Sequence, residues 1–190
     1  MDEIRADIPF FDESGGGVTL SGGEPLAQPN FAIALLKACK LEGVHTAIDT
    51  CGFASKDIFE QSIPYTDLYL FDLKLADSKE HLQYTGVDNK MIIENLRFLS
   101  SVGKRIVIRI PLVEGITDTK HNINGIKSIL STIKGIQRID VLPYHSLAKH
   151  KFTQCNREYT LSDLGNYPMA KAKKIEVEFD GLAPVISVGG

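Results

Sequence analysis

A glycine-rich segment that ends in a glutamate is the strongest chemical signal in this 190-residue sequence. Residues 15–25 are Gly-Gly-Gly-Val-Thr-Leu-Ser-Gly-Gly-Glu-Pro, so a β-prone triplet precedes the pair Gly22-Gly23. Glycines directly after a strand let a ligand approach the backbone without meeting a Cβ atom. The Glu24 carboxylate can accept hydrogen bonds from a cation such as an ammonium group. The segment is therefore either a ligand-binding turn or a tight turn with a solvated glutamate.

Ionisable residues also lie within or directly after three later apolar runs. Asp72 and Lys74 follow one of them, and strand alternation places both on one face, where they either pair with each other or hold a polar ligand. Arg109 lies within a second run and requires a carboxylate, a phosphate or another anionic partner. His145 follows Leu-Pro-Tyr at the end of a third, a position that is either structural or functional.

The pair Asp49-Thr50 ends a further β-prone run, ahead of Cys51-Gly52. It indicates either an Asx-type turn closed by glycine or a contact with a ligand. Cys51 would be reactive only beside a cation, and a small filler role is the alternative. Cys39 falls on the apolar face of a predicted helix, and Cys155 is expected in a loop. These three cysteines are too scattered for a disulfide framework or a closed metal site.

The elements that must position these residues alternate between β-prone runs and helical patterns. Strands are predicted at residues 18–20, 44–50, 68–74, 106–113 and 138–144, and helices at residues 30–41, 56–63, 91–102 and 118–133. For the tail we expect a helix from about Met169 and a sixth strand at 184–188, and the alternation in 174–179 leaves a strand there as the alternative. Strands and helices in this order predict a parallel sheet covered by helices. Because active sites of parallel barrels form at the carboxyl ends of the strands, the polar strand ends should converge on one rim.

Composition excludes several classes of protein. The chain is 43% hydrophobic and 24% charged with a formal net charge of −3, which excludes intrinsic disorder and disfavours a nucleic-acid partner. No apolar run approaches the ~18 residues of a membrane span, and the first residues lack the pattern of a signal peptide. The length corresponds to one domain with a substantial core, expected in a reducing cytoplasm.

Taken together and in this order, the motifs resemble the glycyl-radical-enzyme activating enzymes of the radical S-adenosylmethionine (SAM) superfamily. The resemblance runs from about residue 3 to residue 190. It implies an α/β fold, a partial parallel (β/α)6 TIM-like barrel. It also implies an activity: a [4Fe–4S] cluster and SAM generate a 5′-deoxyadenosyl radical, which installs a glycyl radical on a partner enzyme such as pyruvate formate-lyase. A one-electron donor such as flavodoxin or ferredoxin is implied as a second partner, and neither a nucleic acid nor a membrane is expected.

The resemblance also implies roles for single residues. The residues expected to bind SAM are Gly22, Gly23, Glu24, Asp72, Leu73, Lys74, Arg109 and His145. The glycine pair and the glutamate would bind the methionyl amino group, while the Asp-Leu-Lys strand end would contact the methionyl end. The arginine would approach the carboxylate region of SAM, and the histidine would lie near the ribose. Asp49 and Thr50 match a place where the family can hold a monovalent cation beside that carboxylate.

In one respect the sequence departs from the family. The cluster needs Cys-x3-Cys-x2-Cys, and no such run exists in this chain. We therefore expect residues 1–190 to form a single, N-terminally truncated radical SAM barrel domain that lacks its first strand, leaves residues 18–20 as an edge, and is inactive alone. The alternative is a cluster-less barrel module that binds SAM or another small ligand without redox chemistry. A weaker third possibility is a radical SAM enzyme that modifies another target.

Overall fold

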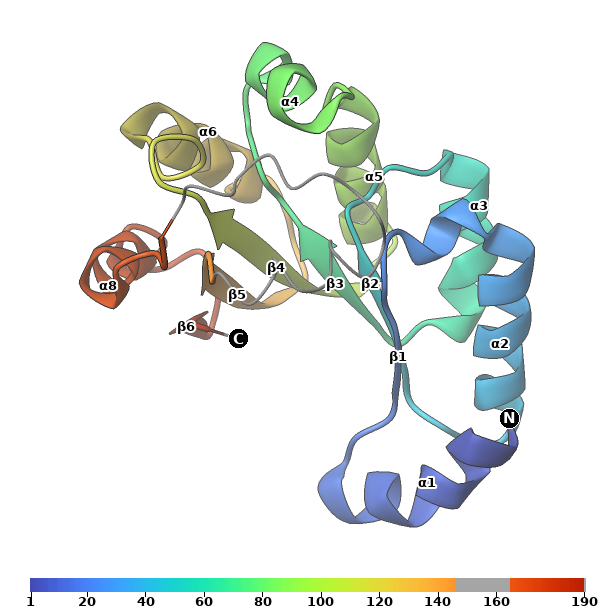
Figure 1. Cartoon of the computed structure of the whole chain (residues 1–190). Helices are drawn as coiled ribbons and strands as arrows, with labels where there is room; N and C mark the ends of the chain where they lie inside the picture. Colours follow the sequence, from blue (N-terminus) through green and yellow to red (C-terminus); the bar gives the residue numbers. More distant parts are fainter. Residues whose placement is uncertain (146–164, 190) are drawn as a thin grey trace.

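Six parallel strands form one curved sheet in the computed structural model, which describes residues 1–145 and 165–189 (Figure 1). The strands are β1 (Val18–Leu20), β2 (Thr46–Thr50), β3 (Leu68–Asp72), β4 (Arg105–Leu112), β5 (Ile136–Pro143) and β6 (Ile186–Val188). They lie side by side in chain order, and each pairs in parallel with its neighbour. Within the described residues β1 and β6 do not pair with each other, so the sheet is an open, partial barrel.

Helices lie between successive strands, and one further helix precedes β1. They are α1 (Asp2–Ser14), α2 (Pro29–Leu41), α3 (Lys56–Ser62), α4 (Ser78–Thr85), α5 (Lys90–Ser101), α6 (Lys120–Leu130) and α8 (Met169–Val177), with short 3-10 turns η1 (Pro25–Ala27) and η2 (Ile63–Tyr65). Figure 1 shows α2, α3, α5 and α6 along one side of the sheet. Helix α1 lies past the amino end of β1 and contributes no buried residue. No helix within the two described ranges combines the length and the apolarity that a bilayer crossing requires.

Strand alternation separates the two faces of the sheet. Alternate strand residues point towards the helices and are fully buried, as at Ile48, Phe71 and Ile108. Together with residues of the helices they form one apolar core. Towards the carboxyl end the residues of the opposite parity carry ionisable side chains, of which Asp49, Asp72 and Arg109 are partly buried and Asp140 is buried. The core therefore stabilises one face of the sheet and leaves the other face for polar contacts.

The expected α/β partial barrel is confirmed, with element boundaries within a few residues of those predicted. Helix α4 is not among the helices predicted from the sequence, because Ser78–Thr85 carries no apolar stripe. A capping signal does precede it: the Asp77 carboxylate accepts hydrogen bonds from the backbone N–H groups of Lys79 and Glu80 at 2.8 and 2.9 Å.

The tail folds as the predicted helix and sixth strand. The alternative strand at 174–179 is wrong, since α8 covers most of that range. Ala172 and Phe179 are fully buried and Ile175 packs beside them. Their spacing of three and four residues is helical, and it outweighs the local alternation.

Candidate functional site

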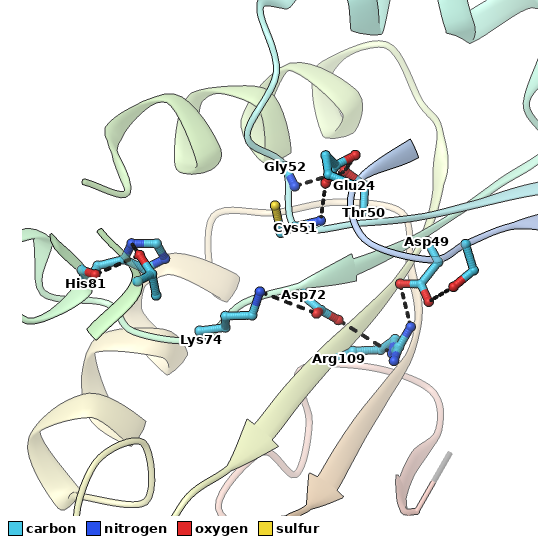
Figure 2. A network of polar contacts seen from close by, with 11 residues as sticks. Glu24, Asp49, Thr50, Cys51, Gly52, Asp72, Lys74, His81 and Arg109 are labelled. Atoms are coloured by element: carbon cyan, nitrogen blue, oxygen red, sulfur yellow. Dashed lines mark hydrogen bonds and ion pairs between the residues drawn. The ribbon is translucent and has the colours of Figure 1, made fainter. Parts of the chain in front are cut away.

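A row of ion pairs crosses three neighbouring strands at the carboxyl end of the sheet (Figure 2). Arg109 of β4 places Nη1 2.5 Å from Asp49 Oδ1 of β2, and Nε 3.5 Å from Asp72 Oδ1 of β3. Lys74, just past β3, holds its Nζ 3.6 Å from Asp72 Oδ2. Asp72 and Arg109 are directly opposed in the β3–β4 register, which accounts for their contact. At the far end of the row, Ser21 Oγ donates a hydrogen bond of 2.9 Å to Asp49 Oδ2.

The Asp72 carboxylate is incompletely satisfied in this row. Its Oδ1 atom is buried and accepts no hydrogen bond from the described residues. Burial raises the pKa of Asp72, and the charges of Lys74 and Arg109 offset this effect only in part. A buried carboxylate oxygen without a donor costs free energy, and an N–H donor from a ligand would remove that cost.

Arg109 stays charged among these groups. Burial acts to lower its pKa, but the hydrogen bond to Asp49 and the charge of Asp72 outweigh burial and raise it. One guanidinium thus serves two carboxylates, so it holds β2, β3 and β4 in a fixed relation at the rim.

Glu24 forms a second cluster beside the row, as Figure 2 shows. Its carboxylate accepts hydrogen bonds from Thr50 Oγ1 at 2.9 Å and from the Cys51 backbone N–H at 2.8 Å. It also accepts the Leu26 N–H at 3.0 Å, which caps the turn η1. Glu24 is therefore not a solvated residue, because it ties the turn after β1 to the loop after β2.

The turn between β1 and Glu24 leaves open space above its glycines. Gly22 and Gly23 have φ angles of +88° and +64°, which L side chains rarely adopt. A Cβ atom added to either glycine would meet no described atom within 4 Å. Backbone is thus exposed here next to the ion-pair row, as a ligand-binding turn requires.

Cys51 lies at the rim but is a poor nucleophile. Burial, together with its contact with the Glu24 carboxylate, raises the pKa of the Cys51 thiol to about 11. The nearby positive charge of Lys74 acts in the opposite direction but is the weaker influence. The thiol is therefore protonated at neutral pH, which supports the filler role rather than a reactive one.

We expect Cys51 to be alkylated by iodoacetamide at pH 8 about ten- to a hundredfold more slowly than N-acetylcysteine, because so little thiolate is present. Peptide mass spectrometry of timed samples measures the rate at this residue. The rate should keep rising between pH 9 and pH 11. A rate at pH 8 equal to that of N-acetylcysteine would contradict the raised pKa.

Other expected site residues lie at the same rim with different environments. The Leu73 side chain is buried, at 1% exposure, so only its backbone could contact a ligand. Its N–H donates a hydrogen bond of 2.9 Å to the Arg109 carbonyl oxygen. Thr50 is also buried, and its hydroxyl is committed to Glu24. His145 is exposed and follows β5 by two residues, hence at the carboxyl end. Cys155 lies outside the described residues.

His81 is a buried histidine of α4 that lies apart from the row in Figure 2. Its Nδ1 is 2.7 Å from the Val87 carbonyl oxygen and 2.9 Å from Thr85 Oγ1. These local contacts indicate a structural residue.

Three buried asparagines near the rim are not found by sequence reasoning. Asn89, Asn95 and Asn122 are each at most 2% exposed, and their amide groups bind backbone in the loops that follow β2 and β3. A signal does exist in the sequence: Asn95 and Asn122 each fall on the apolar stripe of a helix. A buried amide in such a stripe must find partners, which predicts a structural hydrogen-bond network.

Comparisons with known proteins identify the family of the chain. The family described as the radical SAM superfamily matches residues 1–123. Over 191 residues the chain is 38% identical to the trans-4-hydroxy-L-proline dehydratase activating enzyme of Clostridioides difficile, covering 99% of this chain and 63% of that relative. Over 168 residues it is 39% identical to the pyruvate formate-lyase-activating enzyme of Clostridium pasteurianum, covering 88% of this chain and 70% of that relative.

A solved structure gives the same result for the fold. The crystal structure of a domain of pyruvate-formate lyase-activating enzyme from Bacteroides vulgatus ATCC 8482 superposes with a TM-score of 0.76 and 30% identity, covering 92% of this chain and 99% of that domain. The chain spans less than two thirds of the length of the Clostridioides difficile relative. The sequence and structure matches together show that this chain belongs to the glycyl-radical-enzyme activating enzymes of the radical SAM superfamily.

Proposed function

We propose that the rim of this partial barrel binds SAM and that the chain thereby takes part in activating a glycyl radical enzyme. The observation that carries the proposal is the row Asp49–Arg109–Asp72–Lys74 beside the open Gly22-Gly23 turn. Family membership supplies the second support, because the superfamily is defined by its use of SAM.

The residues at the rim fit the methionyl end of SAM. That end carries an ammonium group and a carboxylate, so it needs an acceptor and a cation close together. Asp72 Oδ1 lacks a donor and suits the ammonium group, while Arg109 and Lys74 are cations within reach of a carboxylate. The open glycine turn gives the ligand room against the backbone. Glu24 contributes by holding that turn in place.

The cysteines of the described residues do not fit a [4Fe–4S] cluster. Cys39 is fully buried on α2, towards the amino end of the sheet, whereas Cys51 lies at the carboxyl end. A cluster of this kind needs several thiolates brought together by the fold, and these two residues cannot supply them. The residues that the structure describes therefore do not hold such a cluster.

The work of this chain is to bind and orient. When bound, SAM supplies a sulfonium whose one-electron cleavage allows hydrogen to be taken from a glycine Cα of the partner. The ion-pair row would fix the methionyl end, and His145 would lie near the ribose at the same rim. Asp49 and Thr50 are proposed to hold a monovalent cation, although Arg109 supplies the positive charge beside Asp49 in this structure.

The proposed partner is a glycyl radical enzyme such as pyruvate formate-lyase. The names of the relatives include activating enzymes for pyruvate formate-lyase and for trans-4-hydroxy-L-proline dehydratase, so the family serves several partners. A flavodoxin or ferredoxin is the proposed electron donor, and the cytoplasm is the proposed compartment.

The alternative function is that of a barrel module that binds SAM or another small ligand without redox chemistry. The coding sequence upstream of residue 1 discriminates between the two functions. An activating enzyme requires a three-cysteine motif there, and protein isolated anaerobically with it should yield a glycyl radical signal in electron paramagnetic resonance when mixed with SAM, a reductant and the partner. An in-frame stop codon without such a motif would favour the binding module.

SAM binding by the chain itself tests the site. We expect SAM to bind at least about tenfold more tightly than 5′-methylthioadenosine, which lacks the methionyl amine and carboxylate. Equilibrium dialysis with radiolabelled ligands measures both affinities. In the Lys74→Met variant the difference between the affinities for SAM and 5′-methylthioadenosine should be smaller. Equal affinity of the wild-type chain for the two ligands would show that the row does not hold the methionyl end.

A further inference from the structure

We infer that Asn122 is a positioning residue for Lys74, and that through it helix α6 determines how tightly the methionyl end of SAM is held. The inference rests on the proposed function, because it concerns the same site. Asn122 itself does not face the rim; it is fully buried in the first turn of α6.

The Asn122 amide is saturated by backbone from two loops. Its Nδ2 donates to the carbonyl oxygen of Lys74 at 3.0 Å and to that of Thr117 at 2.8 Å. Its Oδ1 accepts the Ala76 N–H at 2.8 Å. One side chain thus joins the segment after β3 to the segment after β4, and both donors and the acceptor are used.

The segment held in this way has left the sheet. Strand β3 ends at Asp72, and one residue later the Leu73 N–H still donates to the Arg109 carbonyl oxygen of β4. From Lys74 onwards the backbone depends on side chains for partners. Asn89 supplies the others, since its Nδ2 donates to the carbonyl oxygens of Leu75 and Ala76 at 2.9 and 2.8 Å.

This arrangement gives Asn122 a specific effect on the row. Its bond to the Lys74 carbonyl fixes the backbone from which the lysine side chain returns to Asp72, 3.6 Å away. Lys74 and Thr117 also line one hollow of about 480 Å³. On that side no packed side chain holds the Lys74 backbone in place of the Asn122 amide. Without the hydrogen bond from Asn122, the Lys74 ammonium group would no longer be held at a fixed distance from Asp72 and from the methionyl end of SAM.

Asn122→Asp is the sharpest variant. It preserves the shape and the acceptor for Ala76 N–H but loses both donors and turns a carboxylate towards two carbonyl oxygens. We expect the affinity for SAM to fall about tenfold, while the affinity for 5′-methylthioadenosine changes less than about twofold. Equilibrium dialysis gives both values, and hydrogen exchange at the Ala76 amide reports whether the loop has loosened.

Two controls separate positioning from general loss of stability. Ser62→Ala removes buried hydrogen bonds to Phe59 O and Tyr69 Oη at the other end of β3, and it should leave both affinities unchanged. In a Lys74→Met background, Asn122→Asp should no longer alter SAM affinity, because the residue through which it acts is gone. Asn89→Asp removes the two hydrogen bonds that Asn89 donates to the carbonyl oxygens of Leu75 and Ala76 in the same segment. It serves as the second variant if Asn122→Asp fails to fold.

The outcomes distinguish failure of the role inferred for Asn122 from failure of the proposed SAM site. Equal losses for SAM and 5′-methylthioadenosine would show a merely structural role, and an unchanged SAM affinity would also overturn the inference. A persistent effect in the Lys74→Met background would show that Asn122 does not act through Lys74. If the wild-type chain shows no preference for SAM at all, the proposed function fails and the inference fails with it.

Discussion

Replacing Gly23 by valine is expected to lower the affinity for SAM by about a hundredfold or more. The backbone at Gly23 has φ +64°, and nothing in the described structure lies within 4 Å of the place a Cβ would take. The valine methyl groups would fill the space proposed for the ligand, and the left-handed conformation would cost the chain about 1–3 kcal/mol. Equilibrium dialysis measures the affinity, and urea denaturation measures the change in stability.

Gly43→Val is the matched control for this variant. Gly43 has φ +74° and equally open surroundings, but it follows α2 at the amino end of the sheet. Both valines should therefore lower the free energy of unfolding to a similar extent, while only Gly23→Val should weaken SAM binding. SAM affinity that is unchanged in Gly23→Val, or reduced equally in both variants, would count against the proposed position of the ligand.

Asp72→Asn is expected to raise the stability of the chain at pH 7 by about 1 kcal/mol while lowering SAM affinity about thirtyfold. Burial raises the pKa of Asp72, so the folded chain binds this proton more tightly than the unfolded chain does. The contribution of Asp72 to stability is therefore fully present below the unfolded pKa and is lost as pH rises through the folded pKa. Asparagine removes the ionised group that lowers stability at neutral pH, together with the acceptor proposed for the SAM ammonium group.

Asp67→Asn is a control in which the change in stability at pH 7 is expected to have the opposite sign. Burial acts to raise the pKa of Asp67, but Lys40 and the Thr46 N–H, which donates at 3.0 Å, outweigh it and lower the pKa. Its contribution is present above the unfolded pKa and lost as pH falls through the folded pKa, so Asp67→Asn should destabilise the chain at pH 7 without affecting SAM. Urea denaturation of both variants between pH 3 and pH 8 tests the pair. Destabilisation by Asp72→Asn at pH 7 would mean that Arg109 and Lys74 stabilise the ionised carboxylate more than burial opposes it.

Most of the fold could be predicted because the apolar periodicities are strong and agree with the final packing. Thr50 and Asp72 end their strands, and Arg109 lies beside Asp72 in the register of the parallel sheet, so the convergence of these residues followed from topology alone. The tail was harder to predict. Residues 174–179 alternate locally, and only the distant core into which Phe179 packs decides that they are helical.

The partners of each rim residue could not be predicted in the same way. Alternation places Asp72 and Lys74 together, but which carboxylate Arg109 contacts depends on the register of three strands. Glu24 is expected to bind the SAM amino group, and the hydrogen bonds that its carboxylate accepts from Thr50 and the Cys51 backbone could not be predicted from its position in the sequence. Such long-range hydrogen bonds are set by tertiary geometry, which no local pattern encodes.

The order of the strands in the sheet has a consequence for biosynthesis. Because β1 to β6 lie side by side in the order in which they are translated, each strand and its helix can add to an edge that earlier residues have already built. None of the six described strands has to insert between two that have already paired, and each can pair as soon as it has left the ribosome. The growing sheet therefore extends at one edge only, while the outer edge of β1 stays unchanged, so assembly can proceed unit by unit from β1 to β6.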